Sequence, residues 1–151
     1  MSSDYDTQKL YSSDTGLLVT QAFMDADYTG NELYRALMLD RLSVNNGMLA
    51  ENAVAQALRA SGRELYFYSR YGRDETEQKM EIDFLIRRAG KISPIEVKSA
   101  AYQHHASLDK FIRKFAGRIG TPYILYTKDV MEKNGIVHLP LYMTQFLCER
   151  I

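Results

Sequence analysis

Asp83, Glu96 and Lys98 are the residues whose types and spacing most clearly suggest chemistry. They lie in the run EIDFLIRRAGKISPIEVKS, residues 81–99, with twelve residues between the two acids. Mg²⁺ and Mn²⁺ prefer oxygen ligands of this kind, and a nearby ammonium group can help to activate water or hold a phosphate. The run therefore indicates a site for a divalent cation, either Mg²⁺ or Mn²⁺.

A short β-hairpin is the element that must position these groups. In its first strand, Ile82, Phe84 and Ile86 alternate with the other residues and are expected to form one apolar face. In its second strand, Glu96 and Lys98 alternate with apolar residues and share a polar face. The hairpin would thus carry both acids and the lysine on neighbouring strands.

A two-residue turn at Ala89-Gly90 sets the expected register, because glycine readily adopts the positive φ that tight hairpin turns need. The expected cross-strand pairs are then Arg88 with Lys91, Asp83 with Glu96, and Glu81 with Lys98. Opposed residues have Cβ atoms about 5 Å apart, and two carboxylates that close repel unless a cation or a proton intervenes. Pro94 cannot donate to the ladder, so we expect a bulge there or a strand that begins just after it.

A helix over residues 47–62 would add a third acid, Glu51. At helical spacing, the residues that flank Glu51 on one arc are apolar, namely Met48, Val54, Ala55 and Leu58. The opposite flank is polar and carries Asn52, Gln56 and Arg59. Because a glutamate is rarely buried unless it is paired or bound to a cation, Glu51 is a further candidate ligand.

Both acidic features also have purely structural explanations. Alternating charges on a strand often mark a solvated sheet face with cross-strand ion pairs, which would account for Glu81 and Lys98. Glu51 lies near the start of its helix, so it could belong to a buried ion pair or interact with the helix dipole. The residues alone leave both explanations open.

A glutamate on a helix, followed by Asp and Glu-x-Lys on a hairpin, resembles the PD-(D/E)xK nuclease superfamily with its restriction-endonuclease-like fold. More narrowly, the chain resembles a domain of unknown function found C-terminal to many prokaryotic AAA-type ATPases. The resembling segments run from about residue 9 to about residue 127 and include KLY and DTGLL (9–18), GMLAENAV (47–54), YFYSR (66–70), EIDFLI (81–86) and PIEVKS (94–99).

This resemblance implies roles for individual residues. Asp83 and Glu96 would bind the divalent cation, with Glu51 as an outer or second-metal ligand and the backbone carbonyl of Val97 completing the shell. Lys98 would position or deprotonate the attacking water and stabilise charge in the transition state.

The chain departs from the family pattern in two respects. Ile82 stands where the proline that gives the superfamily its name would precede the aspartate, and the sequence contains no GxxxxGK[ST] phosphate loop. An AAA-type ATPase module would therefore act in cis from a longer protein, or in trans. We expect residues 1–45 to be an N-terminal helical segment that remains from such a protein, and residues 46–151 to be the nuclease-like domain.

The rest of the chain predicts the elements of an αβββαβ core. Beyond the helix and hairpin above, we expect a packing segment at 9–23, a helix at 31–42, a strand at 64–70, an amphipathic helix at 104–116, a buried strand at 121–127, an edge strand at 136–139 and a final helix within 141–151. A strand, helix and strand in succession imply a parallel pair. The expected class is α/β, with a mixed central sheet flanked by helices.

Length, charge and cysteine content indicate the domain count and the cellular compartment. The chain has 151 residues, one domain by length, with a formal net charge of +0 and Cys148 as its single cysteine. We expect a cytoplasmic protein with no membrane contact, because no apolar run approaches the roughly 18 residues of a span. A pI near 6.8 argues against strong sequence-independent binding of nucleic acid, although a local basic patch would suffice.

Further candidates lie outside the hairpin. Lys110, Arg113 and Lys114 give the helix at 104–116 a basic side that could meet phosphates, although a solvated helix face is the commoner outcome. Gln103 and Arg70 are secondary candidates, as a polar active-site residue and as a group that orients a carboxylate or a phosphate. The Met- and Leu-rich N-terminal helix could pair two copies into a homodimer.

The sequence therefore leaves two functional hypotheses. The leading hypothesis is a metal-dependent nuclease that hydrolyses phosphodiester bonds with Asp83, Glu96 and Lys98, assisted by Glu51. The alternative is a nuclease-like module that does not cleave and serves as an interaction or regulatory domain of an AAA-type ATPase.

Overall fold

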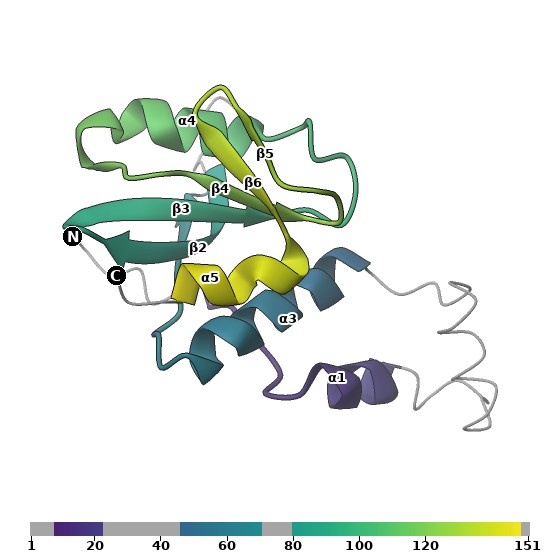
Figure 1. Ribbon diagram of the computed structural model, residues 1–151. Coiled ribbons are helices and arrows are strands. Elements are labelled where there is room, and N and C mark those ends of the chain that lie inside the picture. Colours follow the sequence, from purple (N-terminus) through teal and green to yellow (C-terminus); the bar gives the residue numbers. More distant parts are fainter. Residues whose placement is uncertain (1–7, 23–45, 71–79, 149–151) are drawn as a thin grey trace.

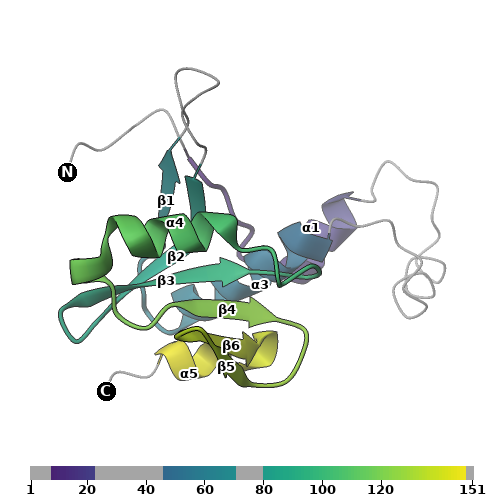
Figure 2. The ribbon, with the colours of Figure 1, turned by 90° about the horizontal axis from the view of Figure 1, so that it is seen from above.

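A computed structural model describes residues 8–22, 46–70 and 80–148 and shows a β-sheet with helices on both faces (Figure 1). In chain order its elements are α1 (Thr15–Ala22), α3 (Asn46–Ala60), β1 (Tyr66–Arg70), β2 (Met80–Arg88), β3 (Lys91–Val97), α4 (Ala106–Lys114), η1 (Ala116–Arg118), β4 (Tyr123–Tyr126), β5 (Met131–Lys133), β6 (Ile136–Pro140), η2 (Leu141–Met143) and α5 (Thr144–Cys148). Helix α4 covers one face of the sheet, and α3 and α5 cover the other (Figures 1 and 2).

The sheet is mixed, as predicted. Within the described residues it has six strands in the order β1-β2-β3-β4-β6-β5. Strands β1, β2 and β3 form an antiparallel meander, and β4 runs parallel to β3 after the crossover through α4. All four residues of β4 are buried, as expected for a strand covered on both faces. The α/β class, with helices flanking a mixed central sheet, is therefore confirmed.

The hairpin between β2 and β3 has the predicted turn. Arg88 pairs with Lys91, and both turn residues have positive φ, 48° at Ala89 and 77° at Gly90. The bulge expected at Pro94 is absent: Pro94 pairs with Leu85 in an unbroken register. The proline is tolerated because the ladder with β4 begins one residue later.

A β-bulge lies instead between β1 and β2. The register shifts between Tyr66 and Tyr68, so two residues of β2, Asp83 and Phe84, oppose a single residue of β1. A bulge of this type adds one residue to a strand and re-aims the side chains around it.

The bulge corrects the prediction that Ile82, Phe84 and Ile86 share one face. Phe84 and Ile86 pack in the core cluster that includes α3 and α5, whereas Ile82 packs with α4 on the other side of the sheet. The extra residue reverses the alternation at this point, which a strict period of two could not reveal.

The C-terminal part of the sheet also differs from expectation. Strand β6 lies inside the sheet between β4 and β5, and the short, exposed β5 forms the edge. The position of β6 agrees with its burial: four of its five residues are buried, including His138. Helix α5 confirms the expected final helix.

The N-terminal segment is described over residues 8–22, where α1 follows a short extended stretch. Asp14 begins this helix, and its Oδ1 accepts a hydrogen bond from the backbone N–H of Leu17 at 3.0 Å. The helix expected at 31–42, and with it the predicted homodimer contact, lies outside the described residues. No helix within the described ranges is long and apolar enough to cross a membrane.

Candidate metal centre

An open pocket of about 400 Å³ lies where the diverging ends of β2 and β3 meet the first turns of α3 and α4. The residues that line it are Gly47, Glu51, Glu81, Asp83, Glu96, Val97, Lys98 and Ser107, and we call it the acid pocket. The structure thus brings together all four residues predicted for catalysis, from one helix and two strands.

Asp83 lies in the acid pocket because of the bulge. The regular ladder between β2 and β3 ends at Phe84 and Ile95, and beyond it Asp83 Oδ2 accepts a hydrogen bond from the backbone N–H of Val97 at 2.8 Å. Burial raises the pKa of the Asp83 carboxyl, although the N–H of Val97 and the charge of Lys9 oppose this effect. The second carboxylate oxygen, Oδ1, faces the pocket and Lys9.

Glu96 and Lys98 form an ion pair within β3 and the residue that follows it. Lys98 Nζ lies 2.7 Å from Glu96 Oε1. Glu96 is only 6% exposed, and its other oxygen, Oε2, is buried with no hydrogen-bond partner among the described residues. Burial raises the pKa of Glu96, and the hydrogen bond and charge of Lys98 oppose that shift. A buried carboxylate oxygen without a partner is costly and calls for a cation or a proton.

The cation that the structure places against the remaining acids is the ammonium group of Lys9. Its Nζ lies 2.9 Å from Glu51 Oε1, 3.1 Å from Glu81 Oε1 and 3.2 Å from Asp83 Oδ1. Burial would lower the pKa of Lys9, but the hydrogen bond to Glu51 and the charges of Asp83 and Glu51 outweigh it and raise the pKa. Lys9 is therefore charged at neutral pH.

Sequence reasoning missed Lys9 as a member of this site. The expected partner of Glu81 was Lys98, whereas the structure pairs Glu81 with Lys9 and Lys98 with Glu96. For Glu51, the structure shows an ion pair with Lys9, as one of the two structural alternatives held, although the pair is only partly buried. The sequence shows only that a lysine lies far upstream of the hairpin. Separation along the chain does not indicate whether two residues are in contact.

Tyr11 and Asn52 were also missed. The Tyr11 hydroxyl donates a hydrogen bond to Glu51 Oε1 at 2.7 Å, and burial together with this bond and the charge of Glu51 raises the pKa of Tyr11. Asn52 was expected on the solvated flank of α3 but is only 2% exposed. It is buried because Ser12 and Thr15 hydrogen-bond to its amide. That packing against α1 is a tertiary contact that helical periodicity does not encode.

The donor set suits a hard divalent cation, since four carboxylate side chains, those of Glu51, Glu81, Asp83 and Glu96, line the acid pocket. Mg²⁺ takes oxygen ligands at about 2.0–2.1 Å, whereas the acids surround Lys9 Nζ at 2.9–3.2 Å. In residues 8–22, 46–70 and 80–148, no three His, Cys, Asp or Glu side chains are placed to hold one metal ion as they stand. The types of side chain in the pocket suit a metal ion, but as they are placed the acids bind the ammonium group of Lys9.

The predicted basic residues of α4 lie away from the acid pocket. Lys110 and Arg113 line a separate hollow of about 320 Å³ with residues of the β5–β6 turn. Lys114 Nζ donates to the Tyr68 hydroxyl at 3.2 Å and lies over the ring of Phe115. Lys114 thus has a packing role on this face of the sheet.

Two secondary candidates are exposed and are not among the residues that line the acid pocket. Gln103 lies in the loop between β3 and α4, and Arg70 ends β1 next to Met80 of β2. Ser107, which was not predicted, reaches the acid pocket from the first turn of α4.

Fold and pocket together define an α/β domain with a cluster of acids where two strands diverge. The chain belongs to the family described as "Domain of unknown function (DUF4143)", whose model matches residues 46–143. The matched region contains Glu51, Asp83, Glu96 and Lys98, while Lys9 precedes it. Neither the curated proteins nor the solved structures gave a match to this chain.

Proposed function

We propose that the acid pocket is the active site of a metal-dependent nuclease of the PD-(D/E)xK type. The observation that carries this proposal is Glu96, which lines one pocket with Asp83 and Glu51 and whose buried Oε2 has no hydrogen-bond partner among the described residues. The order α3, β1, β2, β3, α4, β4 matches the αβββαβ core of the restriction-endonuclease-like fold and supports the same assignment.

Asp83 and Glu96 would hold the ion, Mg²⁺ or Mn²⁺, with Glu51 and the carbonyl of Val97 as additional ligands. When bound, the metal supplies Lewis-acid polarisation of the phosphate and lowers the pKa of water. The N–H of Val97 orients the Asp83 carboxylate through the 2.8 Å hydrogen bond, so one oxygen is fixed by the protein and the other faces the pocket.

Lys98 would act on the substrate rather than on the ion. Its side chain is only 26% exposed and its Nζ lies 2.7 Å from Glu96 Oε1, so the ammonium group is held at the edge of the pocket. There it would orient the attacking water and stabilise the negative charge that develops on the phosphate oxygens. A fixed donor in a partly dry site is effective because it needs no reorganisation during the reaction.

The substrate would be nucleic acid, bound by local basic groups because the chain as a whole is neutral. Lys110 and Arg113 are the candidates on α4. The same proposal includes a cytoplasmic location and an AAA-type ATPase partner, in cis or in trans.

A hydrolysis assay with Mn²⁺ and labelled single- and double-stranded DNA and RNA tests the proposal. Asp83→Asn, Glu96→Gln and Lys98→Met should each reduce cleavage by at least about 10²-fold, the scale for loss of a group that stabilises the transition state. Glu132→Gln, on the exposed edge strand β5, is the matched control and should cleave like the wild type. Cleavage that survives in an Asp83→Asn/Glu96→Gln double variant would exclude this site.

One observation favours the non-cleaving alternative. Lys9 already forms ion pairs with Glu51, Glu81 and Asp83, so these acids could serve only to attach the N-terminal segment to the domain. The protein would then be an interaction or regulatory module of an AAA-type ATPase. Calorimetric titration with Mn²⁺ separates the two, because a purely structural cluster takes up no metal at millimolar concentration.

A further inference from the structure

We propose that the N-terminal strap, residues 8–22, is autoinhibitory, and that the ammonium group of Lys9 competes with a divalent cation for Glu51, Glu81 and Asp83. Metal entry and docking of the strap would then exclude each other. The inference rests on the proposed metal site, and it adds Glu81 as a ligand and the strap as the element that closes the site.

The contacts of Lys9 are those of a cation in a binding site. Its side chain is 16% exposed, and its Nζ reaches one carboxylate oxygen from each of three acids. Those acids come from α3 and from β2, where Glu81 precedes the bulge and Asp83 lies in it. An ammonium group and a divalent ion cannot share these oxygens, because both need the same lone pairs and the two positive charges repel.

A second observation, independent of the acid cluster, points to a cation in the same pocket. Glu96 is more than nine-tenths buried, and its Oε2 has no partner among the described residues. Lys9 contacts the other three acids, while Lys98 contacts Oε1 of Glu96. The docked strap therefore satisfies most of the acid pocket and leaves this one buried oxygen, which an incoming ion would satisfy.

Polar contacts to α3 hold the strap in place. Asn52 accepts a hydrogen bond from the Ser12 N–H at 2.8 Å, and its amide nitrogen donates to Ser12 O at 3.2 Å and to Thr15 Oγ1 at 2.9 Å. Tyr11 donates to Glu51 and packs against Phe84 with 5.5 Å between ring centroids. Hydrogen bonds of this kind can exchange with water at little net cost, which suits a contact that has to open.

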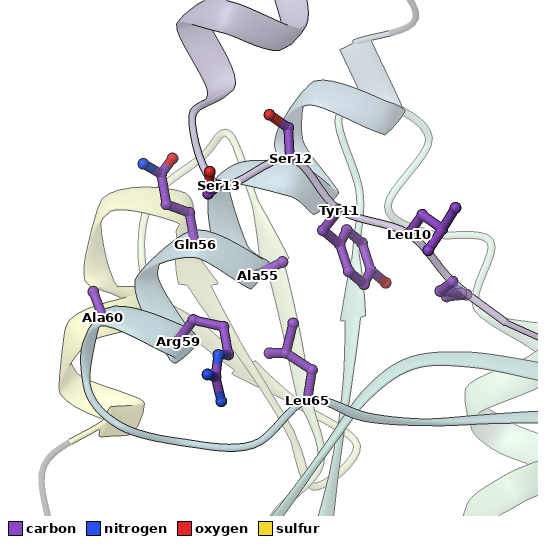
Figure 3. Close-up of a pocket in the computed structure, with 10 residues that line it drawn as sticks. Leu10, Tyr11, Ser12, Ser13, Ala55, Gln56, Arg59, Ala60 and Leu65 are labelled. Carbon is purple, nitrogen blue, oxygen red and sulfur yellow. The ribbon is translucent and has the colours of Figure 1, made fainter.

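The rest of the strap is not packed tightly against the domain. A cleft of about 660 Å³ lies between the strap and the second half of α3, and residues of both elements line it (Figure 3). Leu10 is 91% exposed and Leu17 is 51% exposed, whereas Val19 is buried and Tyr11 packs against the core, so only part of the apolar surface of the strap contributes to its attachment. Figure 1 shows α1 beside α3 and away from the sheet.

Titration calorimetry with Mn²⁺ tests the competition. Lys9→Met removes the charge at similar length and should bind Mn²⁺ at least about tenfold more tightly than the wild type, within the range of typical coupling between sites. Lys9→Arg, which keeps the charge, and Lys133→Met, which removes an exposed lysine of β5, should both match the wild type. Equal Mn²⁺ affinity for the wild type and Lys9→Met would overturn the competition while leaving the metal site in place.

The two proposals fail in different ways. If neither the wild type nor Lys9→Met takes up Mn²⁺, the metal site itself is wrong and the strap has nothing to inhibit. Hydrogen exchange in the wild type provides a test that needs no variant: Mn²⁺ should speed exchange of the Ser12 amide, which donates to Asn52 of α3 when the strap is docked. Unchanged protection of this amide in the Mn²⁺-bound protein would contradict the release of the strap.

Discussion

Two ammonium groups contact the carboxylates of the acid pocket, and they reach them by different routes. Lys98 lies two residues from Glu96, and the pair is fixed by one strand. Lys9 is separated from Glu51 by 42 residues and from Asp83 by 74, and it reaches them from the N-terminal strap. A local pair is a permanent part of the site, whereas a distant partner can be withdrawn when its segment moves. We infer that Lys98 serves the reaction and Lys9 controls access to it.

The largest effect that separates the two lysines should be on hydrolysis. Lys98→Met should reduce the rate by about 10²–10³-fold, because it removes a donor from the transition state. Lys9→Met should preserve the maximal rate and lower the Mn²⁺ concentration needed to reach half of it. A metal titration of the cleavage rate for both variants and the wild type provides the comparison. Equal losses in both variants would mean that the two lysines do not have separate roles.

The next effect concerns stability in the absence of metal. Lys9→Met leaves three carboxylates without their shared cation, and this should lower the free energy of unfolding by about 1–3 kcal/mol, the usual cost of removing one partner of buried polar groups. Urea unfolding with chelator present measures the loss. Mn²⁺ at a hundredfold excess over its Kd should restore about 2.7 kcal/mol, because it binds only the folded state.

Lys98→Met is the informative contrast for this second prediction. It leaves Glu96 buried without its ion pair, so it should also destabilise the metal-free protein. Mn²⁺ should stabilise this variant less than Lys9→Met, because Lys9 still occupies the other acids. Equal rescue of both variants by Mn²⁺ would show that Lys9 does not compete with the ion.

The smallest expected effect is the pH dependence of stability that comes from His138, which lies outside the acid pocket. Burial between Tyr102 and Tyr126 lowers the pKa of His138, and the charges of His105 and Lys133 act in the same direction. The unfolded chain then binds the proton more readily than the folded chain below about pH 6.5. Stability should therefore be complete above that pH and fall as the pH falls.

His138→Phe should weaken this dependence, with about 1.4 kcal/mol involved for each unit by which the two pKa values differ. Thermal unfolding of the wild type and the variant between pH 7.5 and pH 5 measures it. Parallel curves for the two proteins would show that His138 does not contribute.

The sequence predicted the parts of this molecule that depend on local patterns. The turn at Ala89 and Gly90, the antiparallel meander and the buried parallel strand β4 follow from glycine placement, alternation and apolar runs. The register of the hairpin also predicted that Asp83, Glu96 and Lys98 lie close together, whereas the presence of Glu51 beside them was implied by the family resemblance. The features that follow from local patterns need only neighbours along the chain or across one hairpin.

The features that were missed depend on tertiary contacts. The bulge at Asp83 and Phe84 adds a residue without any glycine or proline to mark it, so strict alternation placed Ile82 on the wrong face. Asn52 lies on the polar flank of α3, and only the docked strap makes it a buried residue. Lys9 belongs to the site for the same reason, since no periodicity relates it to the acids.

Anomalous diffraction from crystals grown with Mn²⁺ tests the central claim most directly, because it locates the ion relative to both lysines. We expect a peak within coordination distance of Asp83 and Glu96, with Lys98 retained at the edge of the pocket and Lys9 withdrawn from Glu51. A pocket that shows no Mn²⁺ peak at millimolar metal, in the wild type and in Lys9→Met alike, would contradict the account and leave the acids with a structural role only.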